Sequence, residues 1–217
     1  RVVALGDDLT CLHEDPAEAW PAMLEGMLND QAGSTGRVVV INAGIRRCTS
    51  EQSNTRFSRD VLPFDPHLII FSHIFADSLL RLNRNSGNWR ANIGETEAEQ
   101  AERALCKRIA RLGKHAIHWL PNPFFPEDFG AEDALGEEKK NWAKEQRATI
   151  DHCIRNAKRF SKEYSIPLLN FHSRFEVNGA RSARKWMSNW YLPNKTGTEN
   201  IARWFADTIR RETGLLP

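Results

Sequence analysis

The stretch Val-Val-Ala-Leu-Gly-Asp-Asp-Leu-Thr, residues 2–10, decides the fold of this chain. Its first part is short, aliphatic and rich in β-branched residues, as expected of a strand that is buried on both faces. The segment predicts a strand over residues 1–5. Gly6 then leads into two carboxylates, Asp7 and Asp8. Because open α/β sheets bind ligands at the carboxyl ends of their strands, these two aspartates mark a candidate site.

Four more aliphatic runs have the length of short buried strands. They cover residues 37–42, 67–72, 115–120 and 166–171. Apolar residues elsewhere recur at three- and four-residue intervals, which predicts helices. These helices cover residues 17–30, 97–112, 137–164 and 196–212. Thr196, with Glu199 three residues later, predicts a capping box at the start of the last helix. The alternation predicts a three-layer α/β/α fold around a five-stranded parallel sheet.

Two polar segments, residues 81–96 and 121–136, are rich in Asn, Gly and Pro and follow predicted strands. We therefore expect both at the carboxyl edge of the sheet. The sequence contains no internal repeat, low-complexity tract or linker. A length of 217 residues fits one α/β domain spanning residues 1–217.

Composition excludes some classes of partner. Hydrophobic residues make up 41% of the chain and charged residues 27%, a balance typical of soluble globular proteins. The formal net charge of +2 gives no reason to expect a nucleic-acid partner. No apolar run approaches the ~20 residues of a membrane span. Because the sequence begins on a strand-like segment, we expect that a signal peptide, if the protein has one, is missing from this sequence, and both a cytoplasmic and an exported location stay open.

The four cysteines, Cys11, Cys48, Cys106 and Cys153, form no C-x-x-C pair, which argues against a zinc site. Cys106 and Cys153 lie in helical patterns and are expected as small core residues. Cys11 and Cys48 each follow a predicted strand, so they are either free thiols or partners in one disulfide. We expect no cofactor and no metal, and the oligomeric state stays open.

A second stretch, Met-Ser-Asn-Trp-Tyr-Leu-Pro-Asn-Lys-Thr-Gly at residues 187–197, completes a pattern that the first one begins. Residues 6–10, 40–45, 66–77 and 187–197 resemble, in this order, the signature blocks of the SGNH (GDSL-type) ester hydrolases. The resemblance implies the flavodoxin-like fold of that family. It also implies where a nucleophilic serine, an aspartate and a histidine of a catalytic triad would stand.

All three triad positions differ from the family pattern. Asp8 occupies the position of the serine, Asn189 that of the aspartate and Leu192 that of the histidine. A chain without nucleophile, base and orienting carboxylate lacks the groups that acyl transfer needs. The resemblance therefore implies a catalytically inactive pseudoenzyme that is retained for a binding or structural role.

The oxyanion-hole positions are partly kept. The family forms this hole from the amide of the serine, a glycine of the second block and an asparagine of the third. Gly44 keeps the glycine, whereas Ala76 replaces the asparagine. Ile74 replaces another glycine of the third block, and Asp77 matches the family. Gly44, Ile74 and Ala76 are thus expected as vestigial positions beside the three triad positions.

The replacements suggest a filled site. Leu12, Ile74 and Leu192 are apolar and are expected to occupy space where the family carries glycine or histidine. Arg47 follows the second block, and its guanidinium could form a bidentate pair with Asp8. The alternative is that Arg47 is a solvated loop residue. The expected lining of any remaining pocket is Asp7, Leu12, Arg47, Asp77 and Trp190.

The resemblance implies that an open cleft would hold an acylated sugar or a small ester. The aromatic residues that could line it, unless they pack in the core, are Trp89, Trp119, Phe124, Phe125 and Trp190.

Two other readings stay open. The chain could be a working ester hydrolase whose catalytic groups lie outside the triad positions. An exposed serine within hydrogen-bond reach of a histidine at the carboxyl edge would favour this hydrolase. Ser72 and His73 are unsuited to form such a pair because neighbouring strand residues point to opposite faces. Alternatively, the carboxylates of Asp7, Asp8 and Asp77 could converge on a magnesium or calcium ion.

Overall fold

A parallel sheet of five strands organises the computed structural model, which describes the chain except residues 12–14, 33–36, 83–88, 129–135, 177–182 and 213–217. The strands are β1 (Val2–Gly6), β2 (Val40–Gly44), β3 (Leu68–Ser72), β6 (His115–Leu120) and β7 (Leu168–Asn170). Their order is β2-β1-β3-β6-β7, which is the flavodoxin-like order once the small hairpin β4–β5 is set aside. The predicted fold class is confirmed.

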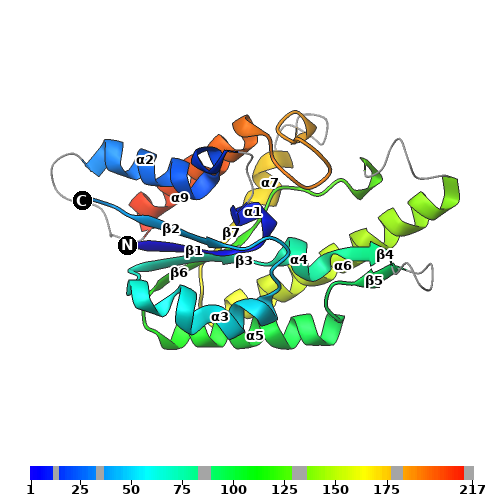
Figure 1. Ribbon diagram of the computed structural model, residues 1–217, viewed down its shortest axis with the longest axis horizontal. Helices are drawn as coiled ribbons and strands as arrows, with labels where there is room; N and C mark the ends of the chain where they lie inside the picture. Colours follow the sequence, from blue (N-terminus) through cyan, green and yellow to red (C-terminus); the bar gives the residue numbers. More distant parts are fainter. Residues whose placement is uncertain (12–14, 33–36, 83–88, 129–135, 177–182, 213–217) are drawn as a thin grey trace.

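Helices cover both faces of the sheet (Figure 1). On one face lie α2 (Trp20–Ala32) and α9 (Lys195–Glu212), which pack against each other. On the other face lie α3 (Ser50–Asp60) and α5 (Glu95–Arg111), and the long α6 (Gly136–Glu163) packs against α5. Three layers result, and the sheet is the middle one.

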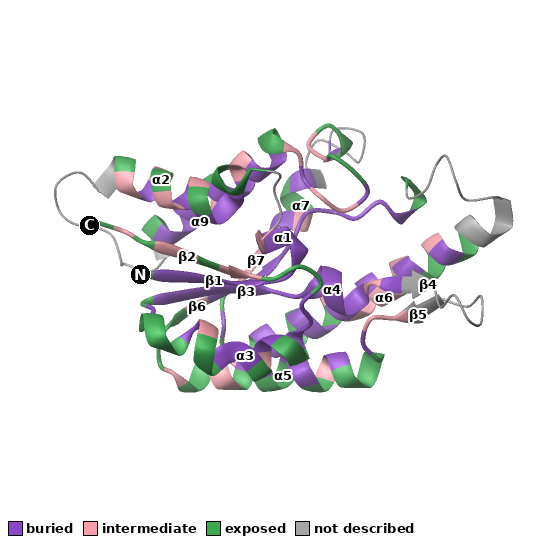
Figure 2. Ribbon diagram, viewed as in Figure 1, coloured by how far each residue is buried: buried purple, intermediate pink, exposed green. Residues whose placement is uncertain are grey.

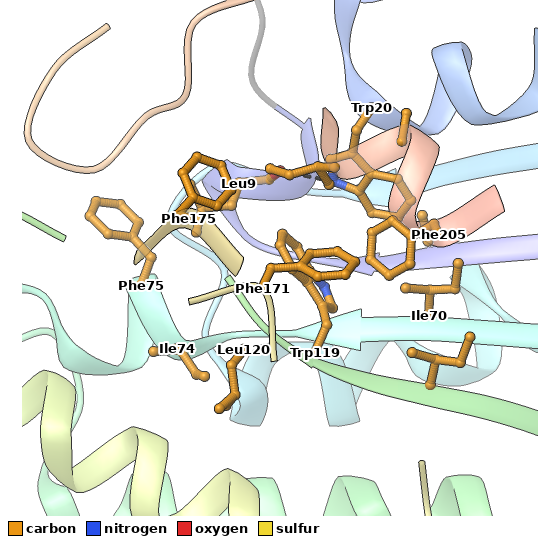
Figure 3. Packing of buried hydrophobic residues seen from close by; sticks show 14 of the residues in the cluster. Leu9, Trp20, Ile70, Ile74, Phe75, Trp119, Leu120, Phe171, Phe175 and Phe205 are labelled. Atoms are coloured by element: carbon orange, nitrogen blue, oxygen red, sulfur yellow. Dashed lines mark hydrogen bonds between the residues drawn. The ribbon is translucent and has the colours of Figure 1, made fainter. Parts of the chain in front are cut away.

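Each face of the sheet has its own apolar core because neighbouring strand residues point to opposite sides. Val2 and Ala4 face the α2/α9 side, where Trp20, Trp119, Phe171 and Phe205 pack ring against ring (Figure 3). Val3 and Leu5 face the α3/α5 side. Strands β1 and β3 are buried along their whole length, whereas the edge strand β2 is largely half-buried (Figure 2).

Several elements were not predicted. Helix α3 was missed, as were the short helices α1 (Asp8–Cys11), α4 (Ile74–Ser78) and α7 (Phe171–Glu176). The hairpin of β4 (Leu80–Leu82) and β5 (Trp89–Ala91) overlaps the segment 81–96 that was expected to be a loop. Three-residue 3₁₀ turns lie at Pro16–Glu18, Leu62–Phe64 and Pro126–Asp128.

The start of the last helix was predicted wrongly. Helix α9 begins at Lys195, and Asn194 caps it because its Oδ1 accepts the Gly197 amide at 3.0 Å. Thr196 is therefore inside the helix. A Cβ on Gly197 would lie 2.3 Å from the Trp186 carbonyl oxygen, so only glycine fits this first turn.

All four cysteines are free thiols, so the alternative of a Cys11–Cys48 disulfide is wrong. Cys106 and Cys153 are buried, as expected of core residues. Across the ranges that the structure describes, we find no helix both long and apolar enough to cross a membrane.

Candidate functional site

The sequence blocks meet at the carboxyl edge of the sheet. Gly6 at the end of β1 is in register with Gly44 of β2 on one side and with Ser72 of β3 on the other. Helix α1 starts at Asp8 directly after β1, and α4 starts at Ile74 directly after β3. The residues after these three strand ends therefore share one neighbourhood, as the sequence predicted.

Asp8, at the position of the family's serine, is only 1% exposed. Its Oδ2 accepts a hydrogen bond from the Arg47 amide at 2.5 Å, and its Oδ1 lies 3.8 Å from Nε of Arg46. Burial raises the pKa of Asp8, while the Arg47 amide, its own amide and the two arginine charges act in the opposite direction. The carboxylate is therefore held as a buried acceptor.

The predicted guanidinium pair between Arg47 and Asp8 needs correction. Arg47 has a φ of 58°, the left-handed conformation, and it is the backbone amide that reaches Asp8. The ion pair to Asp8 comes from Arg46 instead. Both arginines are exposed, so the side chain of Arg47 is solvated, as the alternative prediction had it, while its backbone amide binds Asp8.

Asp7 and Asp77 connect the blocks to one another. Asp7 accepts the amides of Leu9 at 3.0 Å and Ala76 at 2.9 Å, and Asp77 accepts the Ser50 amide at 2.9 Å. Burial, followed by the charge of Asp8, raises the pKa of Asp7 well above its usual range, and burial raises that of Asp77 to about 7. Each of these carboxylates is thus engaged with backbone amides of the scaffold. Among the described residues, no group of three or more His, Cys, Asp and Glu side chains is arranged to hold a metal ion.

The amide of Gly44, the residue that the resemblance assigns to the oxyanion hole, is engaged within the chain. The Gly44 amide donates to Oδ1 of Asn42 at 3.0 Å. A Cβ on Gly44 would lie 2.7 Å from the Cys11 amide nitrogen, so the glycine is needed for the close approach of α1 to β2. Ile74 and Ala76 are both buried, and Ile74 packs in the apolar core. Gly44 therefore has a packing role that is independent of catalysis.

The last block forms a tight loop around Asn189. The Oδ1 of Asn189 accepts the amides of Tyr191 at 3.0 Å and Leu192 at 2.8 Å. Leu192 is half-buried against the core of the α2/α9 face. The buried Asn122 supports the loop by donating from Nδ2 to the Tyr191 carbonyl at 2.9 Å. The sequence analysis missed Asn122, and only its position just after β6 could have indicated a role at this edge of the sheet.

Tyr191 was missed by the sequence analysis although it links two blocks. Its ring stacks on Phe75 of α4, with centroids 4.0 Å apart and planes 7° from parallel. Burial raises the pKa of Tyr191, and the next largest cause is the charge of Asp8. Tyr191 therefore packs the last block against α4.

A cavity of about 640 Å³ opens beside the last block. It is lined by Phe125, Asp128, Arg184, Met187, Ser188, Asn189, Trp190 and Tyr191. The Arg184 guanidinium stands over the Phe125 ring at 4.2 Å and pairs with Asp128, with Nε 2.8 Å from Oδ2. The cavity thus combines aromatic faces with exposed polar groups.

Only some of the predicted lining residues reach this cavity. Trp190 and Phe125 line it, whereas Asp7, Arg47 and Asp77 are absent from its walls. Trp119 and Phe124 pack in the core. Leu12, and the side chain of Trp89, lie outside the described residues.

Two buried serine–histidine pairs occur among the described residues. Ser53 Oγ lies 2.7 Å from Nε2 of His73, close to the end of β3. Ser161 Oγ lies 2.8 Å from Nδ1 of His118, on the α5/α6 side of the sheet. Burial lowers the pKa of both histidines to about 3. Neither serine is exposed, so neither pair meets the condition set for an alternative hydrolase site.

Solved structures of similar shape are esterases and lipases by name. A lipase/acylhydrolase from Enterococcus faecalis is 16% identical with a TM-score of 0.73, covering 100% of this chain and 96% of that one. An acetylxylan esterase from Geobacillus stearothermophilus is 20% identical with a TM-score of 0.72, covering 97% and 94%. A GDSL-like lipase from Bacteroides thetaiotaomicron is 17% identical with a TM-score of 0.66, covering 97% and 88%.

No protein-family model and no curated protein sequence matches the chain. The structural likeness extends over nearly the whole length of both partners in each comparison. The chain therefore has the fold of the SGNH hydrolases, as its sequence blocks predicted.

Proposed function

We propose that this chain is a member of the SGNH/GDSL family, spanning one domain, that binds a ligand without hydrolysing it through the family's triad. The observation that carries the proposal is Asp8. A nucleophile must be free to attack, whereas this carboxylate is buried and hydrogen-bonded to the Arg47 amide. The position has become part of the scaffold.

The remaining chemistry supports the same conclusion. Attack of a carboxylate on an ester gives an anhydride, which still needs a water activated by a base. Leu192 offers no base, and the Gly44 amide is engaged by Asn42. Loss of triad members costs on the order of 10⁴ to 10⁶ in turnover in serine proteases. Ester hydrolysis by this chain is therefore expected to be close to background.

The cavity beside the last block is the proposed binding site. Its aromatic walls suit an apolar group or a sugar face, and the Ser188 and Asn189 side chains are exposed polar partners. Acetylxylan esterases are among the proteins of the same fold. The ligand class that we propose is therefore an acylated sugar or a small ester.

A second candidate function rests on the Ser53–His73 pair. Its 2.7 Å hydrogen bond resembles the nucleophile–base contact of a hydrolase. Ser53 is 0% exposed, however, and burial makes His73 a weak base because its pKa falls to about 3. An active esterase that uses this pair is the less supported alternative.

Hydrolysis of a short-chain p-nitrophenyl ester tests the proposal. The parent protein is compared with its Asp8→Ser/Ala76→Asn/Asn189→Asp/Leu192→His variant and with Ser53→Ala. We expect background rates from the parent and from Ser53→Ala, and a raised rate from the fourfold variant. Parent activity that disappears in Ser53→Ala would replace the binding proposal by the second candidate.

Binding is measured separately by isothermal titration calorimetry with an acetylated xylotetraose. Ser188→Trp places a large side chain in the cavity from an exposed position and should abolish binding. The matched control is Arg203→Gln, an exposed residue of α9. Equal binding by parent and Ser188→Trp would show that this cavity is not the site.

A further inference from the structure

A short turn presents two arginines beside Asp8, at the carboxyl edge of the sheet. Residues 45–48 form this turn, which is closed by a hydrogen bond from the Cys48 amide to the Ile45 carbonyl at 3.1 Å. Arg46 and Arg47 occupy its two central positions. The φ of 58° at Arg47 is a conformation that favours glycine, so the arginine stands here against a backbone preference.

Asp8 holds this turn in place. Its Oδ2 accepts the Arg47 amide, which is the contact that fixes the left-handed residue. The Asp8 side chain is 2% exposed, whereas that of Arg46 is 64% exposed. A serine is shorter and has a single oxygen, so it could not serve the Arg47 amide and Arg46 in this way. Asp8 and the turn that presents the two arginines thus form one structural unit.

The guanidinium groups remain available for a ligand. Arg46 forms its ion pair with Asp8 at 3.8 Å, which is longer than a hydrogen bond, and its side chain is 64% exposed, so in the described part of the chain its donors face solvent. For Arg47, no acidic partner lies within ion-pair distance in the part of the chain that the structure describes. Arginine donors in a planar fork match carboxylate and sulfate oxygens.

Tyr191 joins this turn to the proposed cavity. Its side chain lines the cavity and stacks on Phe75, and α4, which carries Phe75, packs against α1, which carries Asp8. Asp8 at the start of α1 accepts the Arg47 amide, so a chain of contacts leads from the cavity through Tyr191, α4 and α1 to the turn. A ligand that extends from the cavity along these contacts would approach the turn.

We infer that the turn of residues 45–48 is an anion-binding element and that the ligand of this chain is an acidic saccharide bearing a carboxylate or a sulfate. This inference rests on the binding function proposed above and adds an anionic group to its sugar ligand. Asp8 acts as a positioning residue, because it touches the turn and not the ligand. The cavity would hold the sugar, and Arg46 and Arg47 would hold its anionic group.

Calorimetric titration of the full chain with three probes tests this inference. The probes are tetragalacturonate, a sulfated disaccharide and neutral xylotetraose. We expect at least one acidic probe to bind more tightly than xylotetraose, and its Kd to rise with added salt because the contact is ionic. Which acidic probe binds tells whether carboxylate or sulfate is the recognised group.

Arg47→Gly is the decisive variant, since glycine accepts the backbone conformation and removes only the side chain. It should keep the melting temperature of the parent and weaken the acidic probe about tenfold, as expected for one lost hydrogen bond to a charged group. Arg46→Gln should act in the same direction, whereas Arg203→Gln should change nothing.

The outcomes separate the two proposals. Equal affinity for acidic and neutral probes, with no effect of Arg47→Gly, would overturn the acidic ligand class. If Ser188→Trp still abolished binding in that case, the binding function would stand. Absence of binding by all three probes and by acetylated xylotetraose would overturn both.

Discussion

Single residues of the four sequence blocks make structural contacts at the carboxyl edge of the sheet. Asn189 accepts two amides of its own loop, a role that an aspartate could fill as well. Asp7 still ties the first block to the third through the Ala76 amide. Asp8 accepts the Arg47 amide. These contacts give Asp7, Asp8 and Asn189 structural roles in joining the strand ends and closing the last loop.

The contact of Asp8 leads to a prediction about stability. Asp8→Ser should lower the free energy of unfolding by about 1–3 kcal/mol, because the Arg47 amide loses its acceptor in this part-buried hydrogen bond. Asp8→Asn keeps an oxygen of the same reach and should lose less. Urea unfolding of the three proteins at neutral pH measures the difference. A serine variant as stable as the parent would show that the hydrogen bond contributes little.

Contacts between residues could be predicted from the sequence only where both residues follow strands that were themselves predicted. The sequence indicated that Asp8 meets the segment after the second block, because parallel strand ends share an edge. It assigned the contact to the Arg47 guanidinium, since nothing in the pattern shows that Arg47 is left-handed. Tyr191 and Asn122 were missed because their roles depend on the fold of the last block.

At the scale of elements, the free edge of β2 is closed by side chains. Asn29 of α2 donates to the Val38 carbonyl and accepts the Val38 amide, both at 2.9 Å. Glu25 of the same helix accepts the Val40 amide at 2.7 Å. These contacts imitate a neighbouring strand. An exposed edge would otherwise be a template for pairing with a second chain.

Removing these contacts should make the protein self-associate. In Glu25→Ala/Asn29→Ala the amides of Val38 and Val40 lose their acceptors and become free to pair with another edge. We expect dimers or larger species that grow with protein concentration in sedimentation velocity experiments. Asp30→Ala, an exposed residue of the same helix, is the matched control. A double variant that sediments like this control would mean that the edge is protected in another way.

The strands were predictable because burial on both faces requires continuous aliphatic runs, and the predicted bounds differ from β1, β3 and β6 by a residue or less. Helix α3 was missed because only Phe57 interrupts its polar sequence, and the other residues of its buried face, Ser50, Ser53 and Arg56, are polar. The buried Arg56 there donates to the Gly6 and Ala43 carbonyls. The polar face of α3 is therefore buried because it bonds to the strand ends. Apolar periodicity in the sequence does not reveal a buried face of this kind.

At the scale of the whole molecule, two buried ionisable groups meet between the sheet and α5. His118 stacks on Phe71 with ring centroids 4.3 Å apart, and its Nε2 lies 3.4 Å from Oε1 of Glu102 on α5. Burial raises the pKa of Glu102 well above its usual range and lowers that of His118 to about 3. Both groups are therefore favoured in their neutral forms, and the stability of the fold must depend on pH.

Glu102→Gln isolates one part of this dependence. In the unfolded chain Glu102 ionises near its ordinary pKa of 4.5, whereas the folded chain holds the proton to higher pH. The contribution of Glu102 is thus fully present below that ordinary pKa and is lost as pH rises through the folded pKa. Glutamine does not ionise, so the variant should gain stability relative to the parent between about pH 5 and about pH 8, by at most about 1.4 kcal/mol for each pH unit.

His118 is present in both proteins, so its own pH dependence largely cancels in the comparison. That dependence is opposite in sign, because the contribution of His118 to stability is lost as pH falls below its ordinary pKa of 6.5. Urea unfolding at both pH values measures the difference. A difference that stays constant with pH would show that Glu102 ionises in the folded protein as it does in the unfolded one.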